Sequence, residues 1–176
     1  MSLTATPKGD RVQIAIFGRR NAGKSSVINA VTGQQLAIVS DVKGTTTDPV
    51  YKAMEILPIG PCMFIDTPGL DDEGALGRMR VEKAIEVLNR TDIAMLVLDV
   101  SRLTKQELES GRGMGAEEEQ ILAMIEEKKL PYVIVLNQAD KLSGEELTHR
   151  RQCIMAKNGT VPVCAVSTVQ NMGLDA

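Results

Sequence analysis

The chain has 176 residues, of which 43% are hydrophobic and 24% charged, and its formal net charge is −3. This length corresponds to about one domain with a buried core. Aromatic residues make up 2% of the chain, so stacking platforms for single-stranded nucleic acid are not expected. The slightly acidic balance offers no general surface for nucleic acid or an acidic membrane. We therefore expect neither among the partners.

Cysteine usage predicts a reducing compartment. The three cysteines, Cys62, Cys153 and Cys164, are widely spaced, form no CxxC motif and share the chain with one histidine, His149. This pattern predicts reduced thiols packed as small hydrophobic groups, with no disulfide framework and no closed zinc or iron–sulfur site. The N-terminal residues lack the apolar core of a signal peptide, and no apolar run approaches the ~18 residues of a membrane span. We therefore expect a cytoplasmic protein.

Short β-branched runs alternate with longer helical patterns along the chain, which favours an α/β fold with a mainly parallel sheet covered on both faces. In chain order, strands are predicted at 11–17, 50–57, 62–66, 93–100, 131–137 and 161–166, and helices at 24–32, about 78–90, 116–129 and 144–157. The linker "PIGP" is too short for a parallel crossover, so the second and third strands should form an antiparallel hairpin. Gly33 is placed to cap the first helix.

Three irregular segments remain, at 34–49, at 66–77 and, rich in glycine, at 110–115. Long loops in a compact α/β domain are usually functional, and the first two lie near the sheet edge where nucleotides bind in open α/β folds.

The segment "GRRNAGKS", residues 18–25, follows the first strand and opens the first helix. It matches the phosphate-binding pattern GxxxxGK[ST] and is called the phosphate loop below. Its glycines let backbone N–H groups surround a phosphate, and the helix N-terminus adds a partial positive charge. Lys24 would neutralise the β- and γ-phosphates, while Ser25 offers a hydroxyl to Mg²⁺. The expected nucleotide contacts here are Asn21, Ala22, Gly23, Lys24, Ser25 and Ser26.

Two further motifs would complete a catalytic centre. In "DTPG" (66–69), Asp66 would hold Mg²⁺ through water and the Gly69 N–H would sense the γ-phosphate, although an aspartate at a strand end also serves as a turn residue. In "GTTTD" (44–48), a threonine hydroxyl would complete the Mg²⁺ shell and couple loop order to the bound nucleotide. The alternative for the second motif is a threonine-rich lead into a strand.

Base recognition is predicted after the fifth and sixth strands. In "NQAD" (137–140), the Asp140 carboxylate would accept two hydrogen bonds from guanine, which adenine cannot donate, and Asn137 would brace the loop and the base edge. In "VST" (166–168), backbone N–H groups including those of Ser167 and Thr168 would meet guanine O6. A strand-end turn that uses Asn and Asp for local hydrogen bonds is the alternative.

Together, the five motifs resemble the guanine-nucleotide-binding domain of translation-factor-like GTPases. Within that class, "GRRNAGKSSVINAVTGQ", "AIVSDVKGTTTDPVYKAMEI" and "IDTPGLDDEGALG" are similar to the FeFe-hydrogenase maturation GTPase family HydF, a relative of the TrmE/Era group. The resemblance implies a Ras-like fold with a six-stranded sheet, a flexible segment 1–10 and a GTP-binding domain at 11–176. It also implies that this domain is cut before its last helix and before downstream dimerisation and cluster-binding domains.

The resemblance also implies a K⁺ site. In TrmE-like relatives the asparagine corresponding to Asn21 helps to bind K⁺, together with carbonyls that precede the GTT motif. Carried over, these carbonyls belong to Ser40 and Val42, and the Mg²⁺-binding threonine is Thr46. A loop-shaping role is the alternative for Asn21. Leu70 stands where Ras-type enzymes carry a water-orienting glutamine, so hydrolysis should be slow.

Some positions depart from the family pattern or stand outside it. Gln138 replaces the lysine of the usual Asn-Lys-x-Asp motif, and Thr168 stands where alanine is common. The basic pairs Lys128–Lys129 and Arg150–Arg151 are interpreted as solvated charges at helix ends.

Three functions are compatible with this pattern. The first is a slow, K⁺-stimulated GTPase that binds GTP, GDP and Mg²⁺ and acts as a switch in hydrogenase maturation. Its partners would be downstream domains of the same protein and maturation proteins or the apo-hydrogenase, and a GTP-dependent dimer is compatible with it. The second is a GTP-dependent docking module with incidental hydrolysis. The third is an RNA- or ribosome-associated GTPase of the TrmE/Era type, for which a basic or aromatic patch is missing.

Overall fold

The computed structural model of the chain describes residues 10–33, 49–67 and 74–174. Six strands form one sheet in the order β2-β3-β1-β4-β5-β6. Every neighbouring pair is parallel except β2 and β3, which are antiparallel. The predicted α/β fold and its edge hairpin are therefore confirmed. The strands are β1 Val12–Phe17, β2 Val50–Ile56, β3 Gly60–Asp66, β4 Ile93–Asp99, β5 Tyr132–Asn137 and β6 Val163–Ala165.

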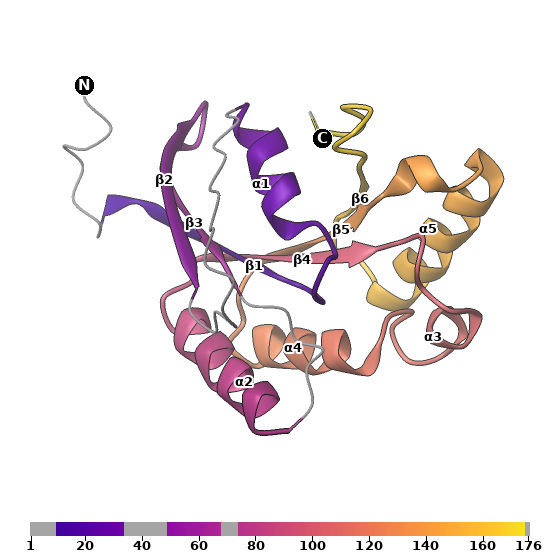
Figure 1. Cartoon of the computed structure of the whole chain (residues 1–176), viewed down its shortest axis with the longest axis horizontal. Helices are drawn as coiled ribbons and strands as arrows, with labels where there is room; N and C mark the ends of the chain where they lie inside the picture. The colour runs from indigo at the N-terminus through magenta and orange to yellow at the C-terminus, as the bar shows by residue number, and fades with distance from the viewer. Residues whose placement is uncertain (1–9, 34–48, 68–73, 175–176) are drawn as a thin grey trace.

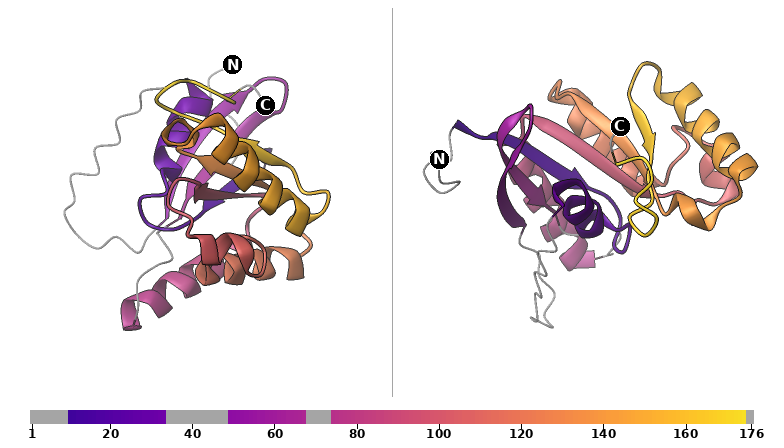
Figure 2. Two further views of the ribbon diagram at one scale, coloured as in Figure 1. Left: turned by 90° about the vertical axis from the view of Figure 1, so that its right-hand side faces the viewer. Right: turned by 90° about the horizontal axis from the view of Figure 1, so that it is seen from above.

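Helices cover both faces of the sheet (Figures 1 and 2). Apolar side chains of α1 pack on one face, and those of α2, α4 and α5 pack on the other. The helices are α1 Lys24–Thr32, α2 Gly74–Leu88, α3 Lys105–Glu109, α4 Ala116–Glu127 and α5 Gly144–Asn158, with a 3₁₀ turn at Ala139–Lys141. Gly33 caps α1 in a left-handed conformation, as predicted.

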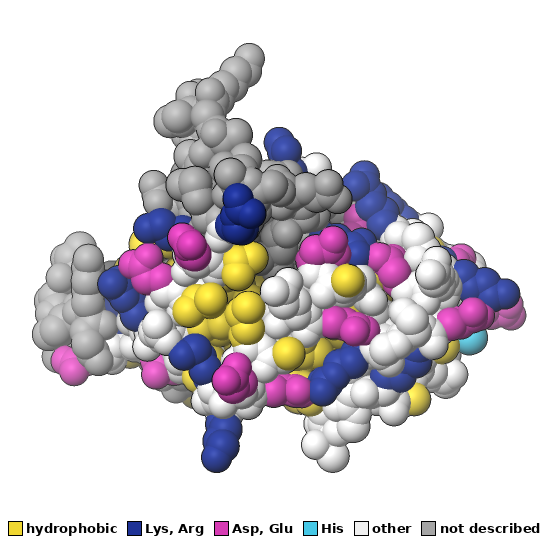
Figure 3. Space-filling view, turned by 90° about the horizontal axis from the view of Figure 1, so that it is seen from below, with side chains coloured by type: hydrophobic (Ala, Val, Ile, Leu, Met, Phe, Trp, Pro, Cys, Tyr) yellow, Lys and Arg dark blue, Asp and Glu magenta, His cyan; other side chains and the backbone are white. Residues whose placement is uncertain are grey.

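Each face has its own core because strand side chains alternate between the two sides. Ala15, Phe17 and Ile65 point toward α2 and α4, whereas Ile16 and Phe64 point toward α1. Figure 3 views the side of α2 and α4, where charged side chains of both signs surround apolar ones. The two cores fix the carboxyl ends of the parallel strands, which carry the predicted motifs.

The structure corrects several predicted boundaries. Helix α2 begins at Gly74, four residues before the predicted start at 78, and β3 begins at Gly60. Helix α3 was not predicted because it spans only five residues, although Thr104 and Glu107 form a capping box at its start. In this capping box the side chains of both residues bond to the partner's backbone.

The interpretation of Arg150 as a solvated helix-end charge was wrong. Its side chain lies in the middle of α5 and is 15% exposed. The guanidinium donates to the carbonyls of Val100, at 2.9 Å, and Leu103, at 2.8 Å, and pairs with Glu146. Arg150 therefore fixes the segment between β4 and α3. Lys128 and Lys129 are exposed at the end of α4, as expected, whereas Arg151 is exposed but also lies in the middle of α5.

Candidate functional site

The phosphate loop joins the end of β1 to the start of α1 at the carboxyl edge of the parallel strands (Figure 1). Gly23 caps the helix with a φ of 88°, a conformation that disfavours side chains. A Cβ on Gly18 would lie 2.4 Å from the Val97 carbonyl oxygen, so the loop passes directly against β4. Both glycines of the motif are therefore required by geometry.

The phosphate loop touches the predicted base-binding loop. The Asn137 amide, 2% exposed at the end of β5, donates a 3.0 Å hydrogen bond to the Ala22 carbonyl. A Cβ on Gly23 would approach the same amide nitrogen to 2.2 Å. Two motifs separated by more than one hundred residues are thus in direct contact, and Asn137 braces the phosphate loop itself.

Lys24 is buried at the start of α1, with 8% of its surface exposed. Its ammonium group donates to the carbonyls of Gly18, at 3.2 Å, and Arg19, at 2.9 Å. The cation therefore lies inside the curve of the loop, where a phosphate group of a ligand would be bound.

Ser25 and Asp66, the two described candidates for Mg²⁺, lie together. The Ser25 hydroxyl donates to Asp66 Oδ2 across the gap between α1 and β3. A hydroxyl and a carboxylate are hard oxygen donors, which suit Mg²⁺ when phosphates and water supply the remaining ligands. Among the described residues there is no group of three or more His, Cys, Asp or Glu side chains that could hold a metal by themselves. The donor set thus fits a magnesium ion shared with a nucleotide.

The guanine end of the predicted site is built by the turn after β5 and the segment after β6. The Ser167 hydroxyl donates a 2.7 Å hydrogen bond to Asp140 Oδ1, which orients the carboxylate. Gln138 has a left-handed φ of 65°, and its amide nitrogen lies 4.0 Å from the position of a Cβ on Gly23. The residue that replaces the family lysine therefore still reaches over the phosphate loop.

Two of the three backbone N–H groups of "VST" already make hydrogen bonds to other backbone groups. Val166 donates its N–H to the Leu136 carbonyl at 2.8 Å, and Ser167 donates to Met172 at 3.0 Å. Within the described part of the chain, Thr168 is the one of the three whose backbone N–H makes no hydrogen bond to another backbone group. An N–H contact to guanine O6 would thus come from Thr168.

Several predicted site residues lie outside the described residues: Ser40, Val42, Thr46, Gly69 and Leu70. Asn21 is described; it is exposed and has a left-handed φ of 61°. Ser26 is exposed on the first turn of α1, and Ala22 is buried in the core beneath the loop.

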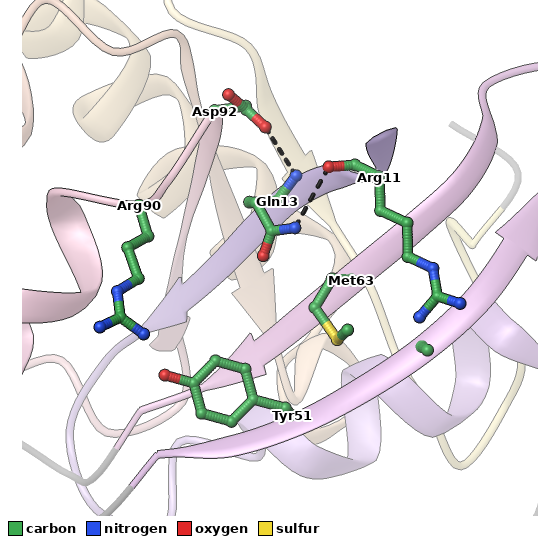
Figure 4. A pocket seen from close by; sticks show the side chains of 7 residues that line it. Arg11, Gln13, Tyr51, Met63, Arg90 and Asp92 are labelled. Atoms are coloured by element: carbon green, nitrogen blue, oxygen red, sulfur yellow. Dashed lines mark hydrogen bonds between the residues drawn. The ribbon is translucent and has the colours of Figure 1, made fainter. Parts of the chain in front are cut away.

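A hollow of about 820 Å³ opens at the other end of the strands (Figure 4). Gln13, Met63 and Ala53 lie in one row across β1, β3 and β2 and form part of its lining. Asp92 accepts a 2.8 Å hydrogen bond from the Gln13 N–H at its rim. Because the phosphate loop follows the opposite, carboxyl end of β1, this hollow is separate from the candidate site.

Thr67 and Arg19 are structural contributors that sequence reasoning missed. Thr67, 3% exposed, donates both its hydroxyl, at 2.6 Å, and its N–H, at 3.2 Å, to the Ile16 carbonyl. This ties the end of β3 to the strand that carries the phosphate loop. The contacts of Arg19, described below, join residues so distant in sequence that no local pattern indicates them.

The described helices include none long and apolar enough to cross a membrane.

Known families place the chain. A family model described as "50S ribosome-binding GTPase" matches residues 13–138. The match covers most of the chain, so the chain belongs to this family of P-loop GTPases. The Ras-like expectation for the fold is thereby confirmed.

Individual relatives narrow the type. GTPase Der of Kosmotoga olearia is 28% identical over 177 residues, which cover 94% of this chain and 37% of that protein. The tRNA modification GTPase MnmE of Alkaliphilus oremlandii is 33% identical over 162 residues, which cover 91% of this chain and 31% of that protein. The structure of an Aquifex aeolicus Era variant bound to GDP and AlF₄⁻ is 25% identical, with a TM-score of 0.72 over 93% of this chain and 53% of that one.

The chain is therefore a guanine-nucleotide-binding GTPase domain of the Der, MnmE and Era type. It spans about a third of the length of these Der and MnmE relatives.

Proposed function

We propose that this domain hydrolyses GTP slowly, with Mg²⁺ and with stimulation by K⁺, and acts as a nucleotide switch in the maturation of FeFe-hydrogenase. The contact between Asn137 and the phosphate loop carries the hydrolytic part of the proposal, because it brings the loop predicted to bind phosphate and the motif predicted to bind guanine into direct contact. The role in maturation is supported by the likeness of three sequence segments to HydF, which also suggests further domains after residue 176.

In the proposed site each described residue has a separate task. Lys24 and the phosphate-loop amides bind the phosphates, and Asp140, held by Ser167, selects guanine. Ser25 and Asp66 hold Mg²⁺, which would neutralise charge on the phosphates. Outside the described residues, Thr46 would complete the metal shell and the Gly69 N–H would contact the γ-phosphate.

K⁺ would be bound by Asn21 together with the carbonyls of Ser40 and Val42. The left-handed conformation of Asn21 turns the loop at this residue, which is compatible with a side chain that contacts an ion beside the phosphates. A monovalent cation there would stabilise the charge that develops during phosphoryl transfer.

Phosphate release from GTP by the purified protein tests hydrolysis. We expect slow turnover with Mg²⁺ in KCl, a lower rate in NaCl and none for Lys24→Ala. GTP, but not ATP, should raise the melting temperature, because a ligand that binds only the folded state stabilises it. Absence of any phosphate release in KCl would refute the proposed GTP hydrolysis. Equal rates in KCl and NaCl would refute only the proposed K⁺ site.

The full-length protein tests the cellular role. We expect that Lys24→Ala in the chromosomal gene abolishes hydrogenase activity in the cell while the level of apo-hydrogenase protein is kept. Normal hydrogenase activity in that strain would contradict the maturation role.

The free cysteines Cys62, Cys153 and Cys164 support a cytoplasmic location.

An RNA-related role is the second candidate. It is favoured by the relatives named as tRNA modification GTPases and by a structure of Era in complex with MgGDPNP and 16S ribosomal RNA, 25% identical with a TM-score of 0.73. Loss of tRNA modification or of ribosomal subunits in the Lys24→Ala strain, with hydrogenase activity unchanged, would favour this role.

A further inference from the structure

Arg19, the second residue of the phosphate loop, is bound by carboxylates from two other elements. Its Nη2 lies 2.5 Å from Glu107 Oε1 on α3 and 3.4 Å from Glu117 Oε2 on α4. Its Nε lies 3.5 Å from Glu118 Oε2, also on α4. We call these four residues the arginine clamp. The clamp joins the loop to a segment about one hundred residues further along the chain.

Two of the three acceptors of the clamp, Glu107 and Glu118, are themselves fixed in place. Glu107 Oε2 accepts a 2.8 Å hydrogen bond from the Thr104 N–H, and Glu118 Oε2 accepts a 2.7 Å bond from the Gly115 N–H. The Glu118 side chain is 2% exposed, and that of Arg19 is 29% exposed. Because Glu107 and Glu118 are held by backbone N–H groups at the starts of α3 and α4, they give the guanidinium one defined position, called its seat below, rather than a flexible surface contact.

Gly115 provides the floor of that seat. A Cβ at this position would lie 1.5 Å from Arg19 Nη2 and 2.5 Å from Cζ, so the guanidinium rests directly on the glycine backbone. The backbone of Gly115 itself, with φ −76° and ψ 164°, is one that any residue adopts. The absence of a side chain at Gly115 therefore leaves the space that the Arg19 guanidinium fills.

The main chain of Arg19 meanwhile shapes the inside of the loop. Its carbonyl accepts the Lys24 ammonium at 2.9 Å and the Ala22 N–H at 3.2 Å. The Arg19 side chain thus belongs to the clamp, while the Arg19 carbonyl contacts the turn of the loop and Lys24. One residue connects the two.

We infer that Arg19 is a positioning residue, through which the segment Thr104–Glu118 sets the shape of the phosphate loop and hence the rate at which nucleotide leaves it. The inference rests on the proposed role of Lys24 and its loop. A charged network of this kind couples two sites when a change at one alters the ligand affinity at the other. The surface formed by α3 and the start of α4 thereby becomes a place from which nucleotide release can be controlled.

Gly115→Ala tests the clamp without removing a charge. The added methyl overlaps the guanidinium and also lies 2.8 Å from Glu118 Oε2, so it disturbs the contacts of the clamp while Arg19 and all three glutamates remain. Gly144→Ala is the matched control, because it lies at the start of α5 and its added Cβ meets no atom within 4 Å beyond its chain neighbours and its own helix backbone. The rate of release of a fluorescent GDP analogue is measured by stopped flow for both variants.

We expect Gly115→Ala and Arg19→Ala to release GDP roughly five- to tenfold faster than the wild type. Glu107→Gln should do so to a smaller extent, and Arg19→Lys should recover part of the effect of Arg19→Ala. Gly144→Ala should release GDP at the wild-type rate. Glu126→Gln is a second control. It removes the charge of a glutamate at the far end of α4, which forms a 2.6 Å ion pair with Arg112 outside the clamp.

Unfolding midpoints, measured in parallel, separate positioning from stability. Faster release in the clamp variants, but not in Glu126→Gln with a similar loss of stability, supports the inference. Wild-type release from both Gly115→Ala and Glu107→Gln overturns it, as does equal acceleration by Glu126→Gln. Failure of the wild type to bind GDP at all would instead refute the proposed nucleotide site.

Discussion

On one side of the phosphate loop a single neutral amide makes the contact, whereas on the other side an arginine and three glutamates make it. Asn137 donates one hydrogen bond from a buried position, whereas the arginine clamp joins a partly exposed arginine to the partly exposed Glu107 and the buried Glu118. A buried neutral contact depends little on salt or pH, but breaking it leaves an unsatisfied polar group. A charged contact responds to its surroundings. The comparison indicates a fixed side and an adjustable side of the same loop.

The largest effect is expected at the fixed side. In Asn137→Asp, the amide donor becomes a carboxylate that faces the Ala22 carbonyl in a buried site, which should lower the free energy of unfolding by about 3 kcal/mol. Urea denaturation measures this loss, and calorimetry should show that GDP binding is lost as well.

Asn158→Asp provides the matched control for this variant. Asn158 is also buried and donates through its amide to two carbonyls, those of Arg112 and Ile154. It should lose similar stability and still bind GDP. Equal loss of GDP binding in both variants would show that the effect is one of unfolding and not of the loop contact.

The adjustable side should give the chain a pH dependence near neutrality. Burial raises the pKa of Glu118 from 4.5 to about 7, against the opposing effects of Arg19 and the Gly115 N–H. Glu107 and Glu117 also face it and add to the rise. In Glu107, burial is outweighed by hydrogen bonds from Thr104 and Arg19, so its pKa is lowered. Glu107 therefore stays ionised when Glu118 takes up a proton.

The folded chain holds a proton on Glu118 that the unfolded chain has already lost between pH 4.5 and about 7. Stability should therefore fall as the pH rises through this range and level off above it, with a contribution of about 2 kcal/mol from this group. Chemical denaturation at pH 5 and pH 8 measures the change. Glu118→Gln should remove that share of the pH dependence; an unchanged profile in the variant would contradict the assignment.

A smaller effect is expected at the guanine end, where the donor of the contact is again a neutral group. Ser167→Ala removes the hydroxyl that orients Asp140. One hydrogen bond to a charged group contributes about 1.5 kcal/mol, so affinity for GDP should fall roughly tenfold. Isothermal titration with GDP and with ADP measures both affinity and selectivity. Gln170→Ala is the control, because only its backbone N–H contacts the Ser167 hydroxyl.

The smallest effect should come from a charge on α3 outside the clamp. Lys105 pairs with Glu109 at 3.7 Å, but the two side chains are 89% and 67% exposed. Lys105→Ala should change stability by less than about 0.5 kcal/mol and leave GDP release at the wild-type rate. An acceleration of release comparable to that of Arg19→Ala would mean that any charge on α3 suffices and that the clamp is not specific.

Much of the fold was predictable because the buried strands are rich in β-branched residues. The runs that become β1, β4 and β5 were located within one or two residues, and the hairpin followed from the length of "PIGP". Helix α3 was not predicted because its five residues are too few to show a helical repeat of apolar positions. Arg150 was misjudged because its two carbonyl acceptors, 47 and 50 residues away, come from an irregular segment that no pattern announces.

The candidate site shows the same division. Lys24, Ser25 and Asp66 are predicted as site residues because each belongs to a short motif, and the structure places Ser25 and Asp66 in contact. The support around them was not identified, apart from the expectation that Asn137 braces a loop. Arg19 meets Glu107 over 88 positions, and Asn137 meets Ala22 over 115. Only packing of the whole sheet brings such pairs together, so the motif predicts the ligand while the fold alone reveals what holds the motif.

Thr67 adds a mechanical consequence. Its hydroxyl and its amide both end on the Ile16 carbonyl, just ahead of the residues that lead into the phosphate loop. The end of β3 therefore cannot slide along β1 without the loss of two hydrogen bonds at once. Asp66, the residue before Thr67, is paired with Ile16 in the sheet, so these bonds hold its carboxylate in register with the strand end that leads into the phosphate loop.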